Sequence, residues 1–203
     1  MAIITFDCDE VLAELSRYML EHHDNTFLWV PLTWDEIVHY HFENIPKIQA
    51  TGANFHEGKK VFDDILLNHS VEKVAPVIGM QDIVWDLKNQ GHELYVVTAR
   101  GDDINQVTLD WIEKHYPGMF SDVIFANHYN DKSISKWEIC RYLDSKLMFE
   151  DTIHNAESVA AEKIPVIMPA KPWNTDYIDQ HQYIIKATSP DEMKQILMRK
   201  WFL

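Results

Sequence analysis

Short apolar runs alternate with stretches of helical periodicity along most of this 203-residue chain. The apolar runs have the length and β-branched or aromatic composition of buried strands, and they fall at residues 3–6, 93–98, 122–126, 147–149, 165–168 and 183–186. Helical patterns separate them at residues 80–90, 103–115, 134–144 and 155–163, and a last helix begins at Ser189. Strands that alternate with helices predict an α/β fold with a doubly wound parallel sheet.

One long segment interrupts this alternation. After the first strand, about sixty residues show no clear strand pattern and are rich in aromatic residues and histidine. Pro31, Pro46 and Gly52 break the segment, so we expect helices joined by loops.

The first strand ends in two carboxylates that stand one residue apart, Asp7 and Asp9. Side chains alternate along a strand, so both would share a face, and a loop at the C-terminal edge can bring both to one reacting atom. Ligands bind at this edge of open parallel sheets, and a divalent cation between the carboxylates would offset their repulsion. The pattern fits phosphoryl chemistry, and it fits equally well a pair that ends the strand and caps the next helix.

Three further polar groups stand at strand ends or helix starts. Thr98 ends the second strand, Lys136 lies at the front of a helical pattern, and Glu150 with Asp151 follows the strand at 147–149. Taken singly, each has an ordinary structural explanation as a strand-end hydroxyl, a solvated lysine or a helix cap. Their order along the chain favours one shared site, in which a hydroxyl and an ammonium hold a phosphate and the acidic pair suits Mg²⁺.

These residues resemble the four motifs of the haloacid dehalogenase (HAD) superfamily, a DxD, a Thr or Ser, a Lys and an acidic motif. The resemblance is closer to the cytosolic type C group of 5'(3')-deoxyribonucleotidases. It rests on Pro76-Val-Ile-Gly79, Thr98-Ala-Arg100, Ser135-Lys136-Trp-Glu-Ile-Cys140, Phe149-Glu-Asp151 and Pro172-Trp173-Asn174. The matches span nearly the whole chain apart from residues 15–75.

The resemblance implies a HAD-like three-layer sandwich with a small helical cap inserted after the first strand. The catalytic core would comprise residues 1–14 and 76–203, and the cap residues 15–75. It also implies that Thr98, Ala99, Arg100 and Lys136 contact the phosphate.

The chemistry can be reasoned from the residues themselves. Phosphate monoesters hydrolyse extremely slowly unaided, so a catalyst needs a positioned nucleophile and electrostatic stabilisation. Asp7 would attack and form an aspartyl-phosphate, while Asp9 would protonate the leaving oxygen and then take a proton from water. A dehalogenase has no need of the second acid, so Asp9 favours a phosphatase. We expect Mg²⁺ to be held by Asp7, the backbone carbonyl of Asp9 and Asp151, with Glu150 in support.

Two positions depart from the superfamily pattern. Glu10 follows the DxD where a small residue, often glycine, is usual, and we expect its side chain to point to solvent. Asn155 stands four residues after Asp151 in place of the commoner acid, which leaves open which side chains reach the metal. Cys8, between the two aspartates, is expected to be a small buried residue rather than a nucleophile.

Composition limits the partners and the compartment. A net charge of −14 disfavours polymeric nucleic acid, and no apolar run is long enough to span a bilayer. The start of the chain lacks a basic region before an apolar segment, and Cys8 and Cys140 form no disulfide framework. We therefore expect a cytoplasmic protein with reduced thiols and no membrane partner. The sequence does not decide between a monomer and a homodimer.

The function predicted from the sequence is a magnesium-dependent phosphatase of small phosphomonoesters, with nucleoside or deoxynucleoside 5'-monophosphates as the expected substrates. Aromatic residues of the cap offer stacking surface for a base, although Trp29, Trp34 and Phe42 are individually better explained as packing residues. His39 and His41 have no third ligand at useful spacing, so we do not expect a metal there. The alternatives are a sugar-phosphate or phosphoglycolate phosphatase, and a catalytically silent ligand-binding protein with the same fold.

Overall fold

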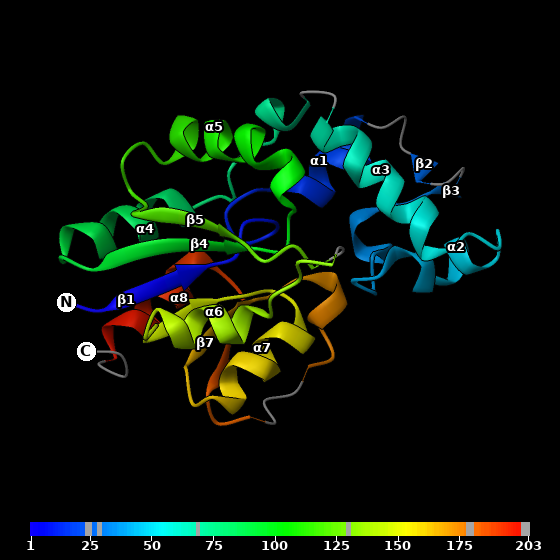
Figure 1. Cartoon of the computed structure of the whole chain (residues 1–203). Coiled ribbons are helices and arrows are strands. Elements are labelled where there is room, and N and C mark those ends of the chain that lie inside the picture. Colours follow the sequence, from blue (N-terminus) through cyan, green and yellow to red (C-terminus); the bar gives the residue numbers. More distant parts are fainter. Residues whose placement is uncertain (23–25, 28–29, 68–69, 129–130, 178–180, 200–203) are drawn as a thin grey trace.

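The computed structural model describes residues 1–22, 26–27, 30–67, 70–128, 131–177 and 181–199. Its centre is a six-stranded parallel sheet with the order β5-β4-β1-β6-β7-β8 (Figure 1). The strands are β1 (Ile3–Phe6), β4 (Glu93–Thr98), β5 (Asp122–Phe125), β6 (Leu147–Phe149), β7 (Val166–Pro169) and β8 (Ile184–Ala187). Each lies within one residue of its predicted bounds, and the predicted α/β class with a parallel sheet is confirmed.

Helices cover both faces of the sheet, as a parallel sheet with apolar strands requires. One face packs against α4 (Met80–Asn89), α5 (Asn105–His115) and α8 (Pro190–Met198). The other packs against α6 (Lys136–Tyr142) and α7 (Ile153–Ala161). Alternating residues of β1 divide between these layers, since Phe6 belongs to the first cluster whereas the Thr5 hydroxyl contacts the Cys140 thiol of α6. None of the helices within the described ranges could cross a membrane.

The insertion after β1 contains more than the predicted helices. The expected helices are present as α1 (Leu15–His22), α2 (Pro46–Gln49) and α3 (Phe55–Leu67), with the 3₁₀ turns η1 (Trp34–Glu36) and η2 (Phe42–Asn44) before α2 and η3 (Ser70–Lys73) after α3. The segment also holds a short antiparallel ladder that the sequence pattern did not indicate, formed by β2 (Thr26–Phe27) and β3 (Val30–Pro31). Pro31 fits there because each strand of a two-stranded ladder is an edge, where a missing N–H is tolerated. Trp29 lies outside the described residues.

The insertion leaves and rejoins the core at neighbouring points. The Val77 N–H donates to the Leu12 carbonyl at 2.8 Å, and the Glu14 N–H donates to the Ala75 carbonyl at 2.9 Å. In Figure 1, α2 and α3 lie beyond the end of the sheet at which β1 and β4 terminate. These two hydrogen bonds support the predicted division into a core of residues 1–14 and 76–203 and a cap of residues 15–75, which stays a prediction.

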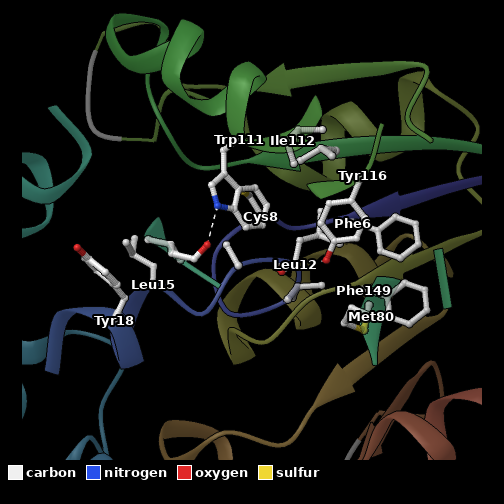
Figure 2. Close-up of a cluster of buried hydrophobic side chains, with 14 of the residues drawn as sticks. Phe6, Cys8, Leu12, Leu15, Tyr18, Met80, Trp111, Ile112, Tyr116 and Phe149 are labelled. Carbon is white, nitrogen blue, oxygen red and sulfur yellow. Dashed lines mark hydrogen bonds between the residues drawn. The ribbon is translucent and has the colours of Figure 1, made fainter. Parts of the chain in front are cut away.

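A large apolar cluster supports the loop that follows β1 (Figure 2). Cys8 and Leu12 from this loop lie beside Trp111 and Tyr116 of the α5 region, and the Tyr116 hydroxyl donates to the Leu12 carbonyl at 3.1 Å. Cys8 is fully buried, and burial raises the pKa of its thiol to about 12. The prediction that Cys8 is a buried packing residue is confirmed, since so high a pKa keeps the thiol protonated and unreactive.

Candidate active site

Sheet order brings the predicted site residues together. Strand β1 lies between β4 and β6, with Phe6 paired to Val96 on one side and to Phe149 on the other. Three neighbouring parallel strands therefore end at one edge, where Asp7, Thr98 and Glu150 follow or end them. Residues distant in sequence meet there because the sheet aligns the strand ends.

Lys136 connects two of these strand ends. Its Nζ lies 2.8 Å from Asp7 Oδ1 and 2.7 Å from Glu150 Oε2, and the lysine side chain is 1% exposed. The first turn of α6 holds the lysine in place, because the Glu138 carboxylate accepts the backbone N–H of Ser135 at 3.1 Å. Burial disfavours the ammonium, yet the two carboxylates raise the pKa of Lys136, so the lysine is charged at neutral pH.

Asp7 is buried but keeps one oxygen without a protein donor among the described contacts. Its Oδ1 accepts the Cys8 N–H at 2.7 Å as well as the Lys136 ammonium. Burial raises the pKa of Asp7 to about 7, even though Lys136 opposes that shift. A cation beside Asp7 would favour the ionised form that a nucleophile needs.

Asp151 is held from two directions by a single dipeptide. The indole N–H of Trp173 donates to Asp151 Oδ2 at 2.9 Å, and the Asn174 amide donates to the Asp151 backbone carbonyl at 2.8 Å. The other carboxylate oxygen, Oδ1, is buried and has no hydrogen-bond partner among the residues that the structure describes. Burial, and then the charges of Glu150 and Asp7, raise the pKa of Asp151 well above its usual range.

These carboxylates fit a hard divalent cation. Asp7, Glu150 and Asp151 each offer an oxygen, and these oxygens lie within 4.8 Å of one another. The orphaned Oδ1 of Asp151 is the observation that favours a cation, since an uncompensated buried carboxylate oxygen is costly. Both oxygens of Glu150 are already engaged, one by Lys136 and one by the Thr152 N–H at 3.0 Å, which suits a supporting position. An all-oxygen donor set favours Mg²⁺ over zinc.

Asp9 faces a different partner from Asp7. The Arg100 guanidinium contacts both of its oxygens, with Nη2 at 2.6 Å from Oδ1 and Nε at 3.0 Å from Oδ2. The Thr98 hydroxyl, fully buried, accepts the backbone N–H of Arg100 at 3.2 Å. Phosphate contact by the Arg100 side chain remains a prediction, and in this geometry its donors are turned to Asp9.

The expectation that Glu10 points to solvent is wrong. Its side chain is 4% exposed, and its backbone adopts a left-handed conformation with φ of 62°. Oε1 accepts the Ser16 N–H at 2.5 Å at the start of α1, while Oε2 lies 3.8 Å from Lys171 Nζ. Burial raises the pKa of Glu10, although Lys171 opposes this. Glu10 therefore adopts the left-handed backbone conformation that glycine adopts most readily, and its side chain is buried against the first turn of α1.

A pocket of about 240 Å³ opens between the sheet edge and the insertion. Its core wall includes Asp7, Asp9, Ala99 and Arg100, and its opposite wall includes the aromatic side chains of Tyr40, Phe42, Phe55 and Phe62. The other predicted site residues are not among its lining residues, namely Thr98, Lys136, Glu150 and Asp151. Trp34 lines a separate groove and packs edge-on against Trp173 at 5.7 Å.

Sequence reasoning missed several contacts at this site. Trp173 and Asn174 drew notice only as a family motif, and the pairing of Arg100 with Asp9 was not anticipated. Lys171 carried no recognisable signal. Its place beside Glu10 depends on how the loop after β7 folds back toward the loop after β1.

Solved structures share this fold over nearly the whole chain. The crystal structure of "a predicted phosphatase" from Clostridium acetobutylicum has a TM-score of 0.67 and 17% identity, with 97% of this chain and 98% of that chain covered. The structure of "the putative HAD-hydrolase YfnB" from Bacillus subtilis, described as bound to magnesium, has a TM-score of 0.58 and 16% identity, with 97% of this chain and 98% of that chain covered. The fold of this chain is therefore the one that these HAD-like structures share.

The family is narrower than the superfamily. The model described as 5' nucleotidase, deoxy (pyrimidine), cytosolic type C protein matches residues 1–201, and the chain belongs to that family. It is also 26% identical over 196 residues to a Bacillus cereus protein named "Putative nucleotidase", with 96% of this chain and 97% of that protein covered. The predicted superfamily and family are confirmed.

Proposed function

We propose that this protein is a magnesium-dependent phosphatase that hydrolyses nucleoside 5'-monophosphates, deoxynucleotides included, in the cytosol. The observation that carries the proposal is the two-sided pocket, with Asp7 and Asp9 on its core wall and aromatic rings on its insertion wall. Such a pocket suits a ligand that has an anionic group at one end and a flat apolar ring at the other. The family name supports the same class of substrate.

In this mechanism an oxygen of Asp7 attacks phosphorus, and the bond from phosphorus to the ester oxygen breaks. Asp9 gives its proton to the leaving alkoxide. In the second step Asp9, now a carboxylate, takes a proton from water, whose oxygen attacks phosphorus and releases inorganic phosphate and Asp7.

The remaining residues bind and orient the reacting groups. Lys136 fixes Asp7 Oδ1 and offsets its charge, and the backbone of Ala99 and the turn after Asp7 contact the phosphate. Asp7, the carbonyl of Asp9 and Asp151 would hold Mg²⁺, which supplies positive charge for the phosphoryl oxygens when bound. The insertion limits access to the pocket, so polymeric DNA should be a poor substrate.

The test is a panel of phosphomonoesters assayed with and without Mg²⁺. We expect kcat/KM for at least one nucleoside 5'-monophosphate to exceed that for any sugar phosphate or for phosphoglycolate, and activity to require the metal. A panel in which every nucleotide ranks below simple sugar phosphates would contradict the nucleotidase proposal and leave a phosphatase of another specificity. No hydrolysis of any ester in a folded, magnesium-loaded protein would favour a ligand-binding role.

A pocket variant tests where the preference arises. Phe55→Ala should lower kcat/KM for the preferred nucleotide while sparing p-nitrophenyl phosphate, because only the nucleotide reaches the aromatic wall. Tyr142→Ala is a matched control, since Tyr142 is 90% exposed and outside the pocket. Equal losses for both substrates would argue against base recognition by Phe55.

A further inference from the structure

Arg100 is committed to the carboxylate of Asp9 by two parallel contacts. The distances are 2.6 Å from Nη2 to Oδ1 and 3.0 Å from Nε to Oδ2, the fork geometry that fixes a carboxylate in its own plane. Both residues line the pocket, but the Arg100 side chain is 2% exposed whereas the Asp9 side chain is 30% exposed. The carboxylate of Asp9 is therefore the more accessible of the two groups from the substrate space.

The third guanidinium nitrogen is anchored as well. Nη1 donates to Thr108 Oγ1 at 2.9 Å, and that hydroxyl in turn donates to the Ile104 carbonyl at 2.9 Å. Thr108 is fully buried on α5, so the guanidinium is fixed from the side away from Asp9. Each of the three guanidinium nitrogens therefore has a protein acceptor, and these bonds use three of the five N–H donors of a side chain that is only 2% exposed.

A carboxylate has about four lone-pair sites, and the fork occupies only two of them. The remaining sites stay available on the exposed side of Asp9. Fixing the plane of the carboxylate then fixes the direction in which a proton is delivered, and general acid catalysis depends on that alignment.

We propose that Arg100 is a positioning residue for Asp9, which aligns the acid with the leaving oxygen, and that it is not a phosphate-binding residue. This role rests on the proposed function, because it takes Asp9 as the general acid of a phosphatase. The two roles predict different substrate dependence. A lost phosphate contact weakens all monoesters alike, whereas a misaligned acid slows chiefly those esters whose leaving group needs a proton.

The experiment compares p-nitrophenyl phosphate, which has a good leaving group, with an alkyl phosphate, which has a poor one. Arg100→Lys keeps the charge but loses the fork. We expect the ratio of kcat/KM for the alkyl ester to that for the nitrophenyl ester to fall at least about tenfold, within the range that acid catalysis supplies. Asp9→Asn should shift the ratio in the same direction, and adding Arg100→Lys to it should cause little further shift, since both remove one function.

Control variants separate positioning from folding. Arg141→Lys alters an arginine whose side chain is 67% exposed and should leave both esters unaffected. Thermal unfolding identifies a variant that fails to fold. If Arg100→Lys does not fold, Thr108→Val is the deciding variant, because it removes the Nη1 acceptor and the bond to the Ile104 carbonyl but leaves both contacts between Arg100 and Asp9. Its expected effect is a shift of about threefold in the same ratio, a fraction of the acid contribution.

Three results would overturn the positioning role. The first is an equal loss of kcat/KM for both esters in Arg100→Lys, or in Thr108→Val if that variant replaces it. The second is a rise in KM with an unchanged ratio of kcat/KM between the esters. The third is a shift of that ratio that adds fully to the shift caused by Asp9→Asn. A wild-type protein that hydrolyses neither ester would overturn the proposed function and this role together. Equal losses in the variant would overturn only the role of Arg100.

Discussion

Trp173→Phe is expected to weaken Mg²⁺ binding without abolishing the fold. The substitution retains an aromatic ring beside Trp34 but removes the N–H that donates to Asp151 Oδ2 at 2.9 Å. Asn174 still holds the Asp151 backbone carbonyl, so the loop keeps its place. The substitution therefore affects the proposed metal site only indirectly, because it loosens the orientation of the Asp151 carboxylate.

The magnitude follows from the kind of hydrogen bond that is lost. Hydrogen bonds to charged groups contribute about 1.5–3 kcal/mol, and Trp173 is 9% exposed, so water cannot readily replace the donor. At about 1.4 kcal/mol for each factor of ten, Mg²⁺ affinity should fall roughly 10- to 100-fold. Loss of a residue that orients a metal ligand typically has an effect of about this size.

Two measurements check this expectation. The first is the Mg²⁺ concentration that gives half-maximal activity. The second is the rise in Tm on adding Mg²⁺ without substrate, which reports binding independently of turnover. Trp85→Phe is the matched control, because it makes the same substitution at a tryptophan on α4 that is 55% exposed and is not among the residues that contact Asp151. The reasoning would be refuted if Trp173→Phe required no more Mg²⁺ than Trp85→Phe.

The remaining predictions concern the nucleophile, the metal ligands and a buried histidine. Asp7→Asn should abolish turnover and leave the protein folded, as activity and circular dichroism would reveal; retained activity would contradict the nucleophile assignment. Asp151→Asn should raise the Mg²⁺ requirement far more than Glu150→Gln, and the reverse order would exchange their roles. His92 accepts the Ala2 N–H at 3.2 Å, and burial lowers its pKa below 6.5. The unfolded chain thus binds this proton first as pH falls, so stability is lost from about pH 6.5 downward, through the folded pKa. His92→Gln should flatten that loss of Tm between about pH 7 and 5, and an unchanged pH profile would count against it.

The sequence by itself determined which elements form and where their polar ends stand. Apolar runs such as Leu147–Phe149 and the β-branched run ending at Thr98 are local patterns, so each strand of the six-stranded sheet could be located within one residue, whereas the two-residue strands β2 and β3 could not. Their alternation with helices implied a parallel sheet, and a parallel sheet aligns the C-terminal ends of its strands. The approach of Asp7 to Lys136 and Glu150 followed from that alignment.

Only the tertiary structure decided which side chains pair at the site. Arg100 reaches Asp9 across 91 positions, and Trp173 reaches Asp151 across 22, so no local periodicity could reveal either contact. The side chain of Glu10 is charged, and its sequence neighbours give no reason to expect that the free energy of desolvation would be compensated, so they favour exposure to solvent. The folded chain buries it because the Ser16 N–H at the start of α1 and the ammonium of Lys171 lie close enough to compensate its charge in part. Such compensation depends on the packing of three separate loops and helices, which exists only once the chain has folded.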